Sequence, residues 1–322
     1  MSKYILEFEE PLRNLEEKIA TLKSTSLKTG MDISSQMNQL SEKLEQMKEK
    51  IYGNLSRWER VQLARHPNRP HSSDYIDAIT ETWVDLHGDR YFGDDKAIIG
   101  GMAKIDNFSV MIIAQEKGRS TKEKLHRNFG MPRPEGYRKA LRLMKLAEKF
   151  NVPVVSLIDT IGAYPGLGAE ERGQAEAIAR NLYEMAMLKT PLISIVIGEG
   201  ASGGALGIGV TDKIACLENT WYSVISPEGC ASILFRDAAR AEQAADAMRV
   251  TANDLKELGI ADDIIPEPIG GAHHHFENVV DSVKKYILST LDELQKLSLD
   301  ELVEKRIAKY DKIGDWKLID QS

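Results

Sequence analysis

Two glycine-rich turns hold the residues of this sequence that are best placed to do chemistry. The first, Asp159–Gly166 (DTIGAYPG), follows the apolar run VVSLI, and the second, Gly198–Ala205 (GEGASGGA), follows the apolar run ISIVI. Each pattern predicts a strand that ends in a turn before a helix, which is where ligands bind at the edge of an open α/β sheet. Glycine lets a ligand approach the backbone and leaves N–H groups at the helix start directed at negative charge. Together, the turns could direct N–H donors at one oxygen, as an oxyanion hole does.

The second turn also permits two other interpretations. Its glycine pair could simply allow close packing of a helix on a strand. Alternatively, Gly200–Gly204 matches the G-x-S-x-G pattern of a hydrolase nucleophile, with Ser202 as the nucleophile. The acids and the histidine that such a triad needs follow in the right order, at Asp262, Asp263 and His273. No P-loop motif and no dinucleotide-type G-x-G-x-x-G occurs, so we do not expect a nucleotide site.

The turns lie within an alternation of predicted strands and helices. Residues 97–116 contain two β-rich runs separated by Asp106-Asn107, which predicts a hairpin. Residues 135–150 and 170–188 have helical periodicity, whereas 152–159 and 191–198 are short, nearly all-apolar runs. This order is typical of βαβ units in a sheet whose strands are buried on both faces.

The first 55 residues predict two helices joined near Gly30. Apolar residues recur there at spacings of three and four, before and after that glycine. The resulting helical hairpin could pack on its own domain or serve as an arm that forms oligomers. We therefore divide the chain into a hairpin extension at 1–55, a central domain at 56–295 and a C-terminal tail at 296–322.

Composition and charge restrict the class of protein. The 322 residues include 42% hydrophobic and 28% charged residues with a net charge of −7, which is typical of a globular protein. Cys216 and Cys230 are too few for a disulfide framework or a four-cysteine zinc site, and they favour a reducing compartment. The N-terminus lacks the apolar region of a signal peptide, and the most apolar stretch, 192–211, contains Glu199 and six glycines. We expect a cytoplasmic protein that neither binds a metal nor enters a membrane.

Five sequence blocks resemble the α subunits of bacterial acetyl-CoA carboxylase carboxyltransferase. In chain order they are GDRYFGDDKAIIGGMA, EKGRSTKEKLHRNFGMPRPEGYRKALRLM, DTIGAYPGLGAEERGQ, IGEGASGGALGIGV and YSVISPEGCASIL. The likeness is strongest between Trp58 and His273. Ile161 departs from the usual DTPGAYPG, which removes some turn rigidity but no N–H donor. The run His273–His275 stands where the family has one histidine, and because adjacent side chains diverge, we expect a surface tract rather than a metal site.

The resemblance implies an α/β fold of the ClpP/crotonase type, a ββα spiral with an N-terminal helical extension and C-terminal helices. It implies that residues 56–295 form a CoA carboxyltransferase domain of the C-terminal type. This domain would transfer a carboxyl group from carboxybiotin on the biotin carboxyl carrier protein to acetyl-CoA. The product would be malonyl-CoA, in the committed step of fatty acid synthesis. The implied partners are a β subunit with a zinc ribbon, in an α2β2 assembly, together with the carrier protein and biotin carboxylase.

On this hypothesis, the two turns bind the ureido oxygen of biotin. The backbone N–H groups of Gly203 and Gly204 are the predicted donors, with Gly162 or Ala163 opposite. No side-chain base is evident, and in the family's proposed chemistry the biotin nitrogen takes the proton. The other predicted substrate-binding residues are Lys117, Arg119, Tyr164, Pro165, Gly166, Gly200 and Ser202. A serine hydrolase that uses Ser202 and a non-catalytic binding scaffold remain the alternatives.

The segment Lys117–Lys149 is unusually basic for this acidic chain, with eleven Lys and Arg residues and three acids. Such a concentration predicts an anionic partner: CoA phosphates, the carboxybiotin carboxylate or an acidic carrier surface. Nucleic acid is disfavoured because the segment has no aromatic stacking platform. Lys117 and Arg119 follow a predicted strand and should point to the ligand edge. A solvated helix face with salt bridges is the expectation for Lys139, Arg142, Lys145 and Lys149.

Overall fold

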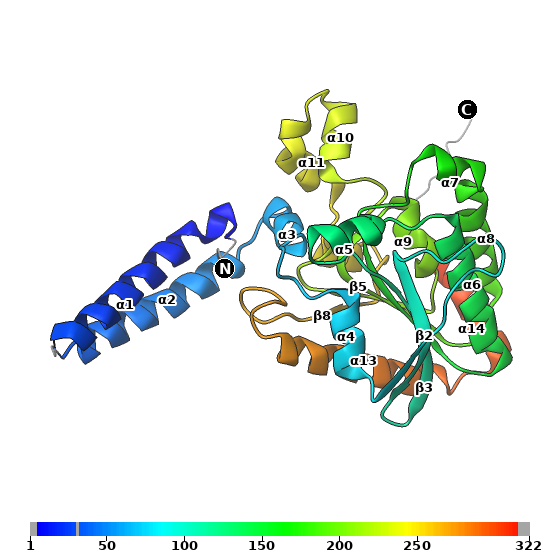
Figure 1. The fold of residues 1–322 in the computed structure, drawn as a ribbon, viewed down its shortest axis with the longest axis horizontal. Coiled ribbons are helices and arrows are strands. Elements are labelled where there is room, and N and C mark those ends of the chain that lie inside the picture. Colours follow the sequence, from blue (N-terminus) through cyan, green and yellow to red (C-terminus); the bar gives the residue numbers. More distant parts are fainter. Residues whose placement is uncertain (1–4, 30–31, 315–322) are drawn as a thin grey trace, which may run out of the picture.

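An eight-stranded sheet forms the centre of the protein in the computed structural model, which describes residues 5–29 and 32–314 (Figure 1). The main path of the sheet runs β1-β2-β3-β4-β5-β6-β8, and β7 pairs with β5. The pairs β1–β2 and β2–β3 are antiparallel, and all pairs from β3 onward are parallel. The strands are β1 (Thr82–Asp85), β2 (Ile98–Ile105), β3 (Phe108–Gln115), β4 (Val154–Thr160), β5 (Leu192–Ala201), β6 (Lys213–Leu217), β7 (Trp221–Ser223) and β8 (Asp263–Ile265).

The predicted strands around the two turns are confirmed. The hairpin expected at 97–116 is β2–β3, and the apolar runs before the turns lie in β4 and β5. Both strands continue into the predicted turn segments, β4 to Thr160 and β5 to Ala201. Every residue of β4 and β5 is buried, as expected for parallel strands that are covered on both faces. Because β4 and β5 are parallel neighbours, the turns that follow them lie at the same edge of the sheet.

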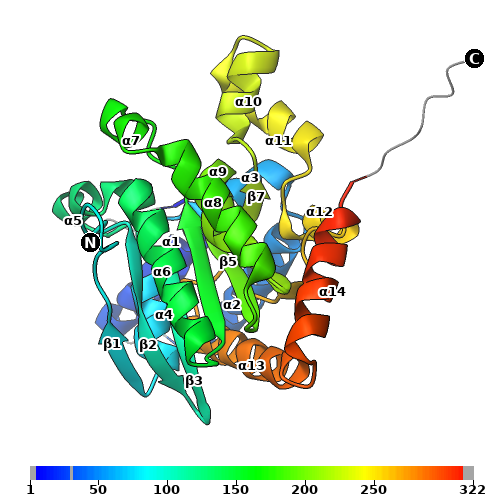
Figure 2. The ribbon, with the colours of Figure 1, turned by 90° about the vertical axis from the view of Figure 1, so that its right-hand side faces the viewer.

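Helices cover both faces of the sheet and make two apolar cores (Figure 2). One core packs side chains such as Leu143 and Met144 against the strands, and the other packs residues such as Ile76 and Ile287. Burial of one such side chain contributes about 1.5–3 kcal/mol. The first face carries α6 (Pro134–Lys149), α8 (Gln174–Met187) and α9 (Ser202–Gly209), and the second carries α4 (Ser72–Ile79) and α13 (Phe276–Leu294).

The C-terminal helix α14 (Leu299–Asp311) lies in the segment that we predicted as a tail, and it packs on the domain. Its Arg306 side chain is fully buried and pairs with Asp212 at 2.8 Å. The same guanidinium donates to the carbonyl oxygens of Met185, Leu188 and Thr190. One cation thereby links the end of α8 to the loop before β6.

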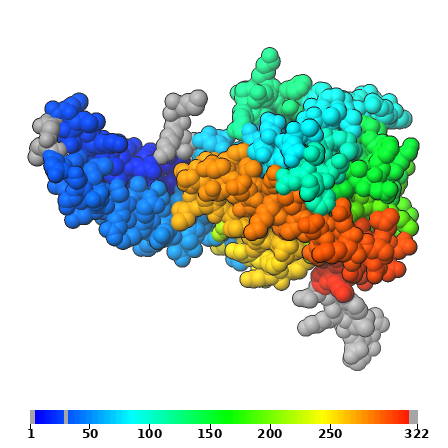
Figure 3. Space-filling view, turned by 90° about the horizontal axis from the view of Figure 1, so that it is seen from below, coloured from blue at the N-terminus to red at the C-terminus, as the bar shows by residue number. Residues whose placement is uncertain are grey.

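The N-terminal helices α1 (Glu10–Thr29) and α2 (Ser34–Tyr52) form a hairpin that projects from the body (Figures 1 and 3). No described residue of α2 is buried, and Leu12 and Leu15 are the buried apolar residues of α1. The hairpin begins at η1 (Glu7–Glu9), where Glu9 accepts a 2.5 Å hydrogen bond from the Tyr52 hydroxyl. The two helices therefore pack mainly on each other rather than on the central domain.

Short helices surround the edge of the sheet at which the turns lie. In Figure 2, α7, α10 and α11 extend beyond that edge, and α10 packs mainly against α11 and η3. No helix among residues 5–29 and 32–314 is long and apolar enough to cross a membrane. These short elements are α3 (Arg57–Ala64), α5 (Thr121–His126), η2 (Asn128–Gly130), α7 (Leu167–Glu171), α10 (Pro227–Leu234), η3 (Ala238–Arg240), α11 (Ala241–Met248) and α12 (Ala252–Glu257).

Candidate active site

The structure brings the two glycine turns into backbone contact. A Cβ atom added to Gly204 would lie 2.5 Å from the carbonyl carbon of Gly162 and 2.7 Å from the nitrogen of Ala163. Real Cβ contacts essentially never come this close, so only glycine fits at position 204. The turns that the sequence predicted to converge therefore lie directly against each other.

The second turn leads straight into α9, whose N-terminal N–H groups have no side-chain cap. Ala201 is the N-cap residue and forms no side-chain hydrogen bond. The first-turn N–H groups of a helix have no acceptor within the helix, so those of Ser202, Gly203 and Gly204 remain available. The helix dipole adds partial positive charge at this position. Gly203 is half-buried, and Gly204 is buried.

The first turn is held differently, because a side chain closes it. The Thr160 hydroxyl donates to the Gly130 carbonyl oxygen at 2.6 Å and accepts from the Gly162 N–H at 3.1 Å. The Tyr164 N–H donates to the Pro132 carbonyl oxygen at 3.0 Å. In the described part of the chain, the N–H of Ala163, which lies between them, has no hydrogen-bond acceptor. Of the two alternatives predicted for this turn, the geometry favours Ala163 over Gly162.

Lys117 follows β3 as expected, but its ammonium group is already paired. It lies 2.6 Å from Asp159 and 2.7 Å from Glu199, the acids at the ends of β4 and β5. Burial alone would lower the pKa of Lys117, but the two carboxylates outweigh burial and raise it. Glu199 also pairs with Arg65 at 2.6 Å. Lys117 lines a cavity of about 230 Å³ that Ile161 also lines, and its role in binding substrate stays a prediction.

The remaining predicted binding residues divide between exposed and structural positions. Arg119 is half-exposed and pairs with Asp74. The Tyr164 ring lies under the Arg133 guanidinium at 4.9 Å and Pro165 is exposed, whereas a Cβ on Gly166 would strike the Tyr164 ring. Gly200 was expected to bind substrate, but it is buried in β5 with the ring of Tyr222 where its side chain would be, so close packing explains this glycine.

No hydrolase triad is assembled around Ser202. Among the described residues, no hydrogen bond joins Ser202 to a histidine or an acid. Asp262 pairs with Lys309, and Asp263 accepts from the Tyr286 hydroxyl. Both acids lie at the start of β8, two strands away from β5 in the sheet. The match to G-x-S-x-G therefore has no supporting geometry.

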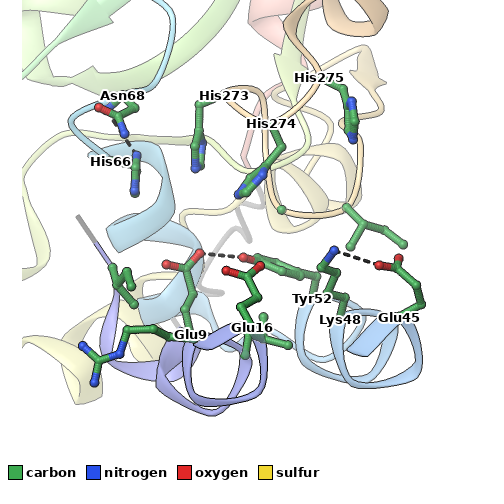
Figure 4. A pocket seen from close by; sticks show the side chains of 15 residues that line it. Glu9, Glu16, Glu45, Lys48, Tyr52, His66, Asn68, His273, His274 and His275 are labelled. Carbon is green, nitrogen blue, oxygen red and sulfur yellow. Dashed lines mark hydrogen bonds and ion pairs between the residues drawn. The ribbon is translucent and has the colours of Figure 1, made fainter. Parts of the chain in front are cut away.

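The histidine tract lies at the base of the helical hairpin, as Figure 4 shows. His273 stacks on His66 with ring centroids 3.9 Å apart, and His274 and His275 are exposed. Burial, together with the neighbouring His66, His274 and Arg69, lowers the pKa of His273 to about 3. Across the part of the chain that the structure describes, no group of three or more His, Cys, Asp or Glu side chains is arranged to hold a metal ion.

The basic segment is partly neutralised by ion pairs within the protein. Arg138 pairs with Asp89 at 2.9 Å, Lys139 with Asp94 at 2.6 Å, and Lys145 with Glu184 at 2.8 Å. The predicted salt bridges of Lys139 and Lys145 are present, but Lys139 is buried rather than solvated. Arg142 donates to backbone oxygens of His87 and Gly88, and the Lys149 ammonium lies 5.8 Å from the Phe150 ring centroid.

Comparison of the sequence with known proteins shows the family to which the chain belongs. The model of acetyl co-enzyme A carboxylase carboxyltransferase-like proteins matches residues 5–314. The chain belongs to this family. Relatives named acetyl-coenzyme A carboxylase carboxyl transferase subunit alpha include one from Flavobacterium johnsoniae, 53% identical over 97% of this chain and 99% of the relative. Another, from Bacillus cereus (strain B4264), is 57% identical over 96% of this chain and 95% of the relative.

Solved structures with lower sequence identity to this chain share its fold. The transcarboxylase 12S matches with a TM-score of 0.56 and 18% identity, over 81% of this chain and 46% of that one. A chain of a Pseudomonas malonate decarboxylase hetero-tetramer, solved with coenzyme A, matches with a TM-score of 0.58 and 16% identity, over 72% of this chain and 90% of that one. The chain thus spans about half of the transcarboxylase and most of the decarboxylase chain. The predicted crotonase-type α/β fold with terminal helices is confirmed.

Proposed function

We propose that this chain is the α subunit of an acetyl-CoA carboxylase carboxyltransferase and that its two glycine turns stabilise the ureido oxygen of biotin. The observation that supports this function best is the contact of Gly204 with Gly162 and Ala163 at the uncapped start of α9. The substrates would be carboxybiotin on a carrier protein and acetyl-CoA, and the product malonyl-CoA. The chain itself would hold neither metal nor nucleotide.

The reaction requires that two developing negative charges be stabilised. Carboxybiotin loses its carboxyl group and leaves charge on the ureido oxygen, while acetyl-CoA loses a methyl proton and gains charge on the thioester oxygen. A preorganised N–H donor contributes about 3 kcal/mol when charge develops in front of it. We assign the donors for the ureido oxygen to Gly203 and Gly204 on one side and Ala163 on the other.

Among the described residues, the site offers backbone donors and no evident side-chain base. The acids within the turns, Asp159 and Glu199, are engaged with Lys117, and attraction to that cation and to Arg65 outweighs burial and lowers the pKa of Glu199. A carboxylate held in this way is a weak base. The proposal therefore leaves proton abstraction to the biotin nitrogen, as in the chemistry proposed for the family.

One oxyanion hole serves one of the two charges, so we propose that the second comes from a separate β subunit. The expected assembly is α2β2 in the cytoplasm, where it meets the carrier protein and biotin carboxylase. The purified chain should form no malonyl-CoA from carboxybiotin and acetyl-CoA, and activity should appear when a carboxyltransferase β subunit is added. Robust synthesis by the single chain would contradict this function.

Exposed apolar side chains beside the turns are where we expect the β subunit to bind. Ile161 belongs to the first turn, and Leu167, 74% exposed, begins the helix after it. Val224, 76% exposed, follows β7, whose Ser223 pairs with Ala201 at the second turn. Single exposed apolar side chains are normal on a monomer, but a contiguous group of them marks an interface.

A charge placed at this surface tests the assignment. Val224→Asp should weaken assembly with the β subunit by at least about tenfold, because a carboxylate would be desolvated in the interface. Ile307→Asp on α14 is the control, since Ile307 is 45% exposed on another helix. Binding can be measured by titration of the β subunit, and equal affinities for the two variants would exclude this surface.

A further inference from the structure

Gln115 connects the two glycine turns through one side chain. It is the last residue of β3 and is completely buried. The side-chain amide oxygen of Gln115 accepts a hydrogen bond from the Asp159 N–H at 3.1 Å, at the start of the first turn. Its amide NH₂ donates to the Gly204 carbonyl oxygen at 2.7 Å, in the second turn. Both ends of the amide are therefore occupied, one by each turn.

The bridge lies where the pairing of β4 with β5 is irregular. The β4–β5 ladder is regular up to Ile158 and shifts register before Thr160, so that Thr160 pairs with Gly200. Inside this irregularity the Asp159 carboxylate accepts from the Glu199 N–H at 2.9 Å. Side chains add to the irregular ladder there, and the Gln115 side chain bonds both to the first turn and to α9.

A primary amide suits both partners at every pH. The Asp159 N–H requires an acceptor, and the Gly204 carbonyl requires a donor. Glutamine supplies one of each, an ionised glutamate supplies acceptors alone, and methionine of similar length supplies no strong donor. A buried group left without its partner is destabilised, so the turns would move apart or rotate to relieve it.

We infer that Gln115 is a positioning residue for carboxyl transfer, which sets the separation between the N–H donors of the two turns. This inference rests on the proposed oxyanion role of Gly204 and Ala163. Misplacement of reacting groups by about 1 Å can lower a rate about a hundredfold. Gln115 does not touch the substrate, so its loss should lower kcat and leave the KM for acetyl-CoA nearly unchanged.

Gln115→Met and Gln115→Glu, each assembled with the β subunit, test the inference. The Met variant should lose about tenfold or more in kcat at every pH, with KM changed by less than about twofold. In the Glu variant, burial raises the pKa of the new carboxyl. Below that pKa, its O–H donates to Gly204 and its second oxygen accepts from Asp159, so kcat should approach the wild-type value. Above it, a carboxylate faces the Gly204 oxygen, and kcat should fall as pH rises.

The pH profile separates positioning from simple loss of stability. Wild-type Gln115 does not titrate, so the ratio of variant to wild-type kcat isolates the new carboxyl between about pH 6 and about pH 9. Asn219→Asp is the control, because Asn219 is another buried amide that binds Arg60 and Glu267 away from the turns. Its kcat per assembled complex should follow the wild-type profile.

The outcomes are distinct. A slow Met variant together with a Glu variant that reaches near wild-type kcat at some pH in that range supports the inference. A Met complex with wild-type kcat, or a Glu complex that stays slow at every pH, overturns it. If the Gln115→Met variant does not assemble, the pH profile of kcat of the Gln115→Glu complex alone supports or overturns the inference. Should Gly204→Val retain full turnover, the oxyanion assignment itself fails, whatever the Gln115 variants do.

Discussion

The two glycine turns occupy equivalent places after β4 and β5, yet they are built in different ways. The first turn is closed by the Thr160 hydroxyl, which accepts the Gly162 N–H. The second opens into α9 without a cap, so its N–H groups remain available. A glycine at a strand end can therefore be a donor or merely part of the turn, and only the hydrogen bonds around it distinguish these roles.

The two glycines at the contact are also required for different reasons. Gly162 has φ +140°, a conformation that L side chains rarely adopt, yet a Cβ there would meet nothing within 4 Å. Gly204 is required because the backbone of the first turn occupies the space of its side chain. Gly162 is required for its backbone conformation and Gly204 for the lack of space. Substitutions at the two positions should therefore have different effects.

The largest expected effect comes from breaking the support that both turns share. Lys117→Met leaves Asp159 buried without its cation and Glu199 with Arg65 alone, which should lower the free energy of unfolding by about 3–5 kcal/mol. Because the pairing holds the pKa of Glu199 low, stability from it is present at neutral pH and is lost as pH falls. The difference in the free energy of unfolding between the variant and the wild type should therefore become smaller at acidic pH. Urea unfolding at several pH values measures this, with Lys122→Met on exposed α5 as the control.

Gly204→Val tests the donor side of the comparison directly. The added side chain would displace the first turn and the N–H donors, at a cost of about 3 kcal/mol or a hundredfold in turnover. Gly93→Val is a matched control, because a Cβ at Gly93 meets nothing within 4 Å. Turnover is compared per assembled complex. A Gly204→Val complex with near-normal turnover would refute the oxyanion assignment.

Thr160→Val tests the closed turn. The variant keeps the shape of the side chain but leaves the Gly162 N–H and the Gly130 carbonyl without their shared partner, which should cost about 1–3 kcal/mol of stability. Thr80→Val removes a hydroxyl that bonds only to a helix carbonyl and should cost less. Thermal unfolding of the two variants gives the comparison. If Thr160→Val lowers turnover per complex more than Gly204→Val does, the closed first turn contributes more to catalysis than the second turn.

The smallest effect should come from Ser202→Ala. The hydroxyl has no acid or histidine partner in the described chain, whereas the N–H of the residue is unchanged by the substitution. Turnover per complex should stay within about twofold of wild type. An intact complex that is inactive would instead revive the hydrolase alternative, and labelling by a fluorophosphonate probe would then identify Ser202 as the nucleophile.

The sequence predicted the parts of the site that depend on local pattern. Apolar runs followed by glycines placed both turns, and parallel pairing of neighbouring strands brought them together. It did not predict that Lys117 pairs with Asp159 and Glu199 or that Thr160 closes the first turn, because these contacts depend on how side chains from different strands meet at the edge of the sheet. The sequence contains one indication of the role of Gln115, which is a polar residue at the end of the apolar run FSVMIIA. That signal alone does not show that both ends of its amide are used.

The buried Arg306 on α14 has a consequence for the synthesis of this protein on the ribosome. Its guanidinium is the partner of Asp212 and of three backbone carbonyls that all precede it in the chain. Until translation reaches residue 306, these acceptors have no cation, and a buried carboxylate without a partner is strongly unfavourable. We expect the sheet to consolidate only as α14 emerges. Prematurely terminated copies would then stay unfolded and be excluded from assembly into the enzyme.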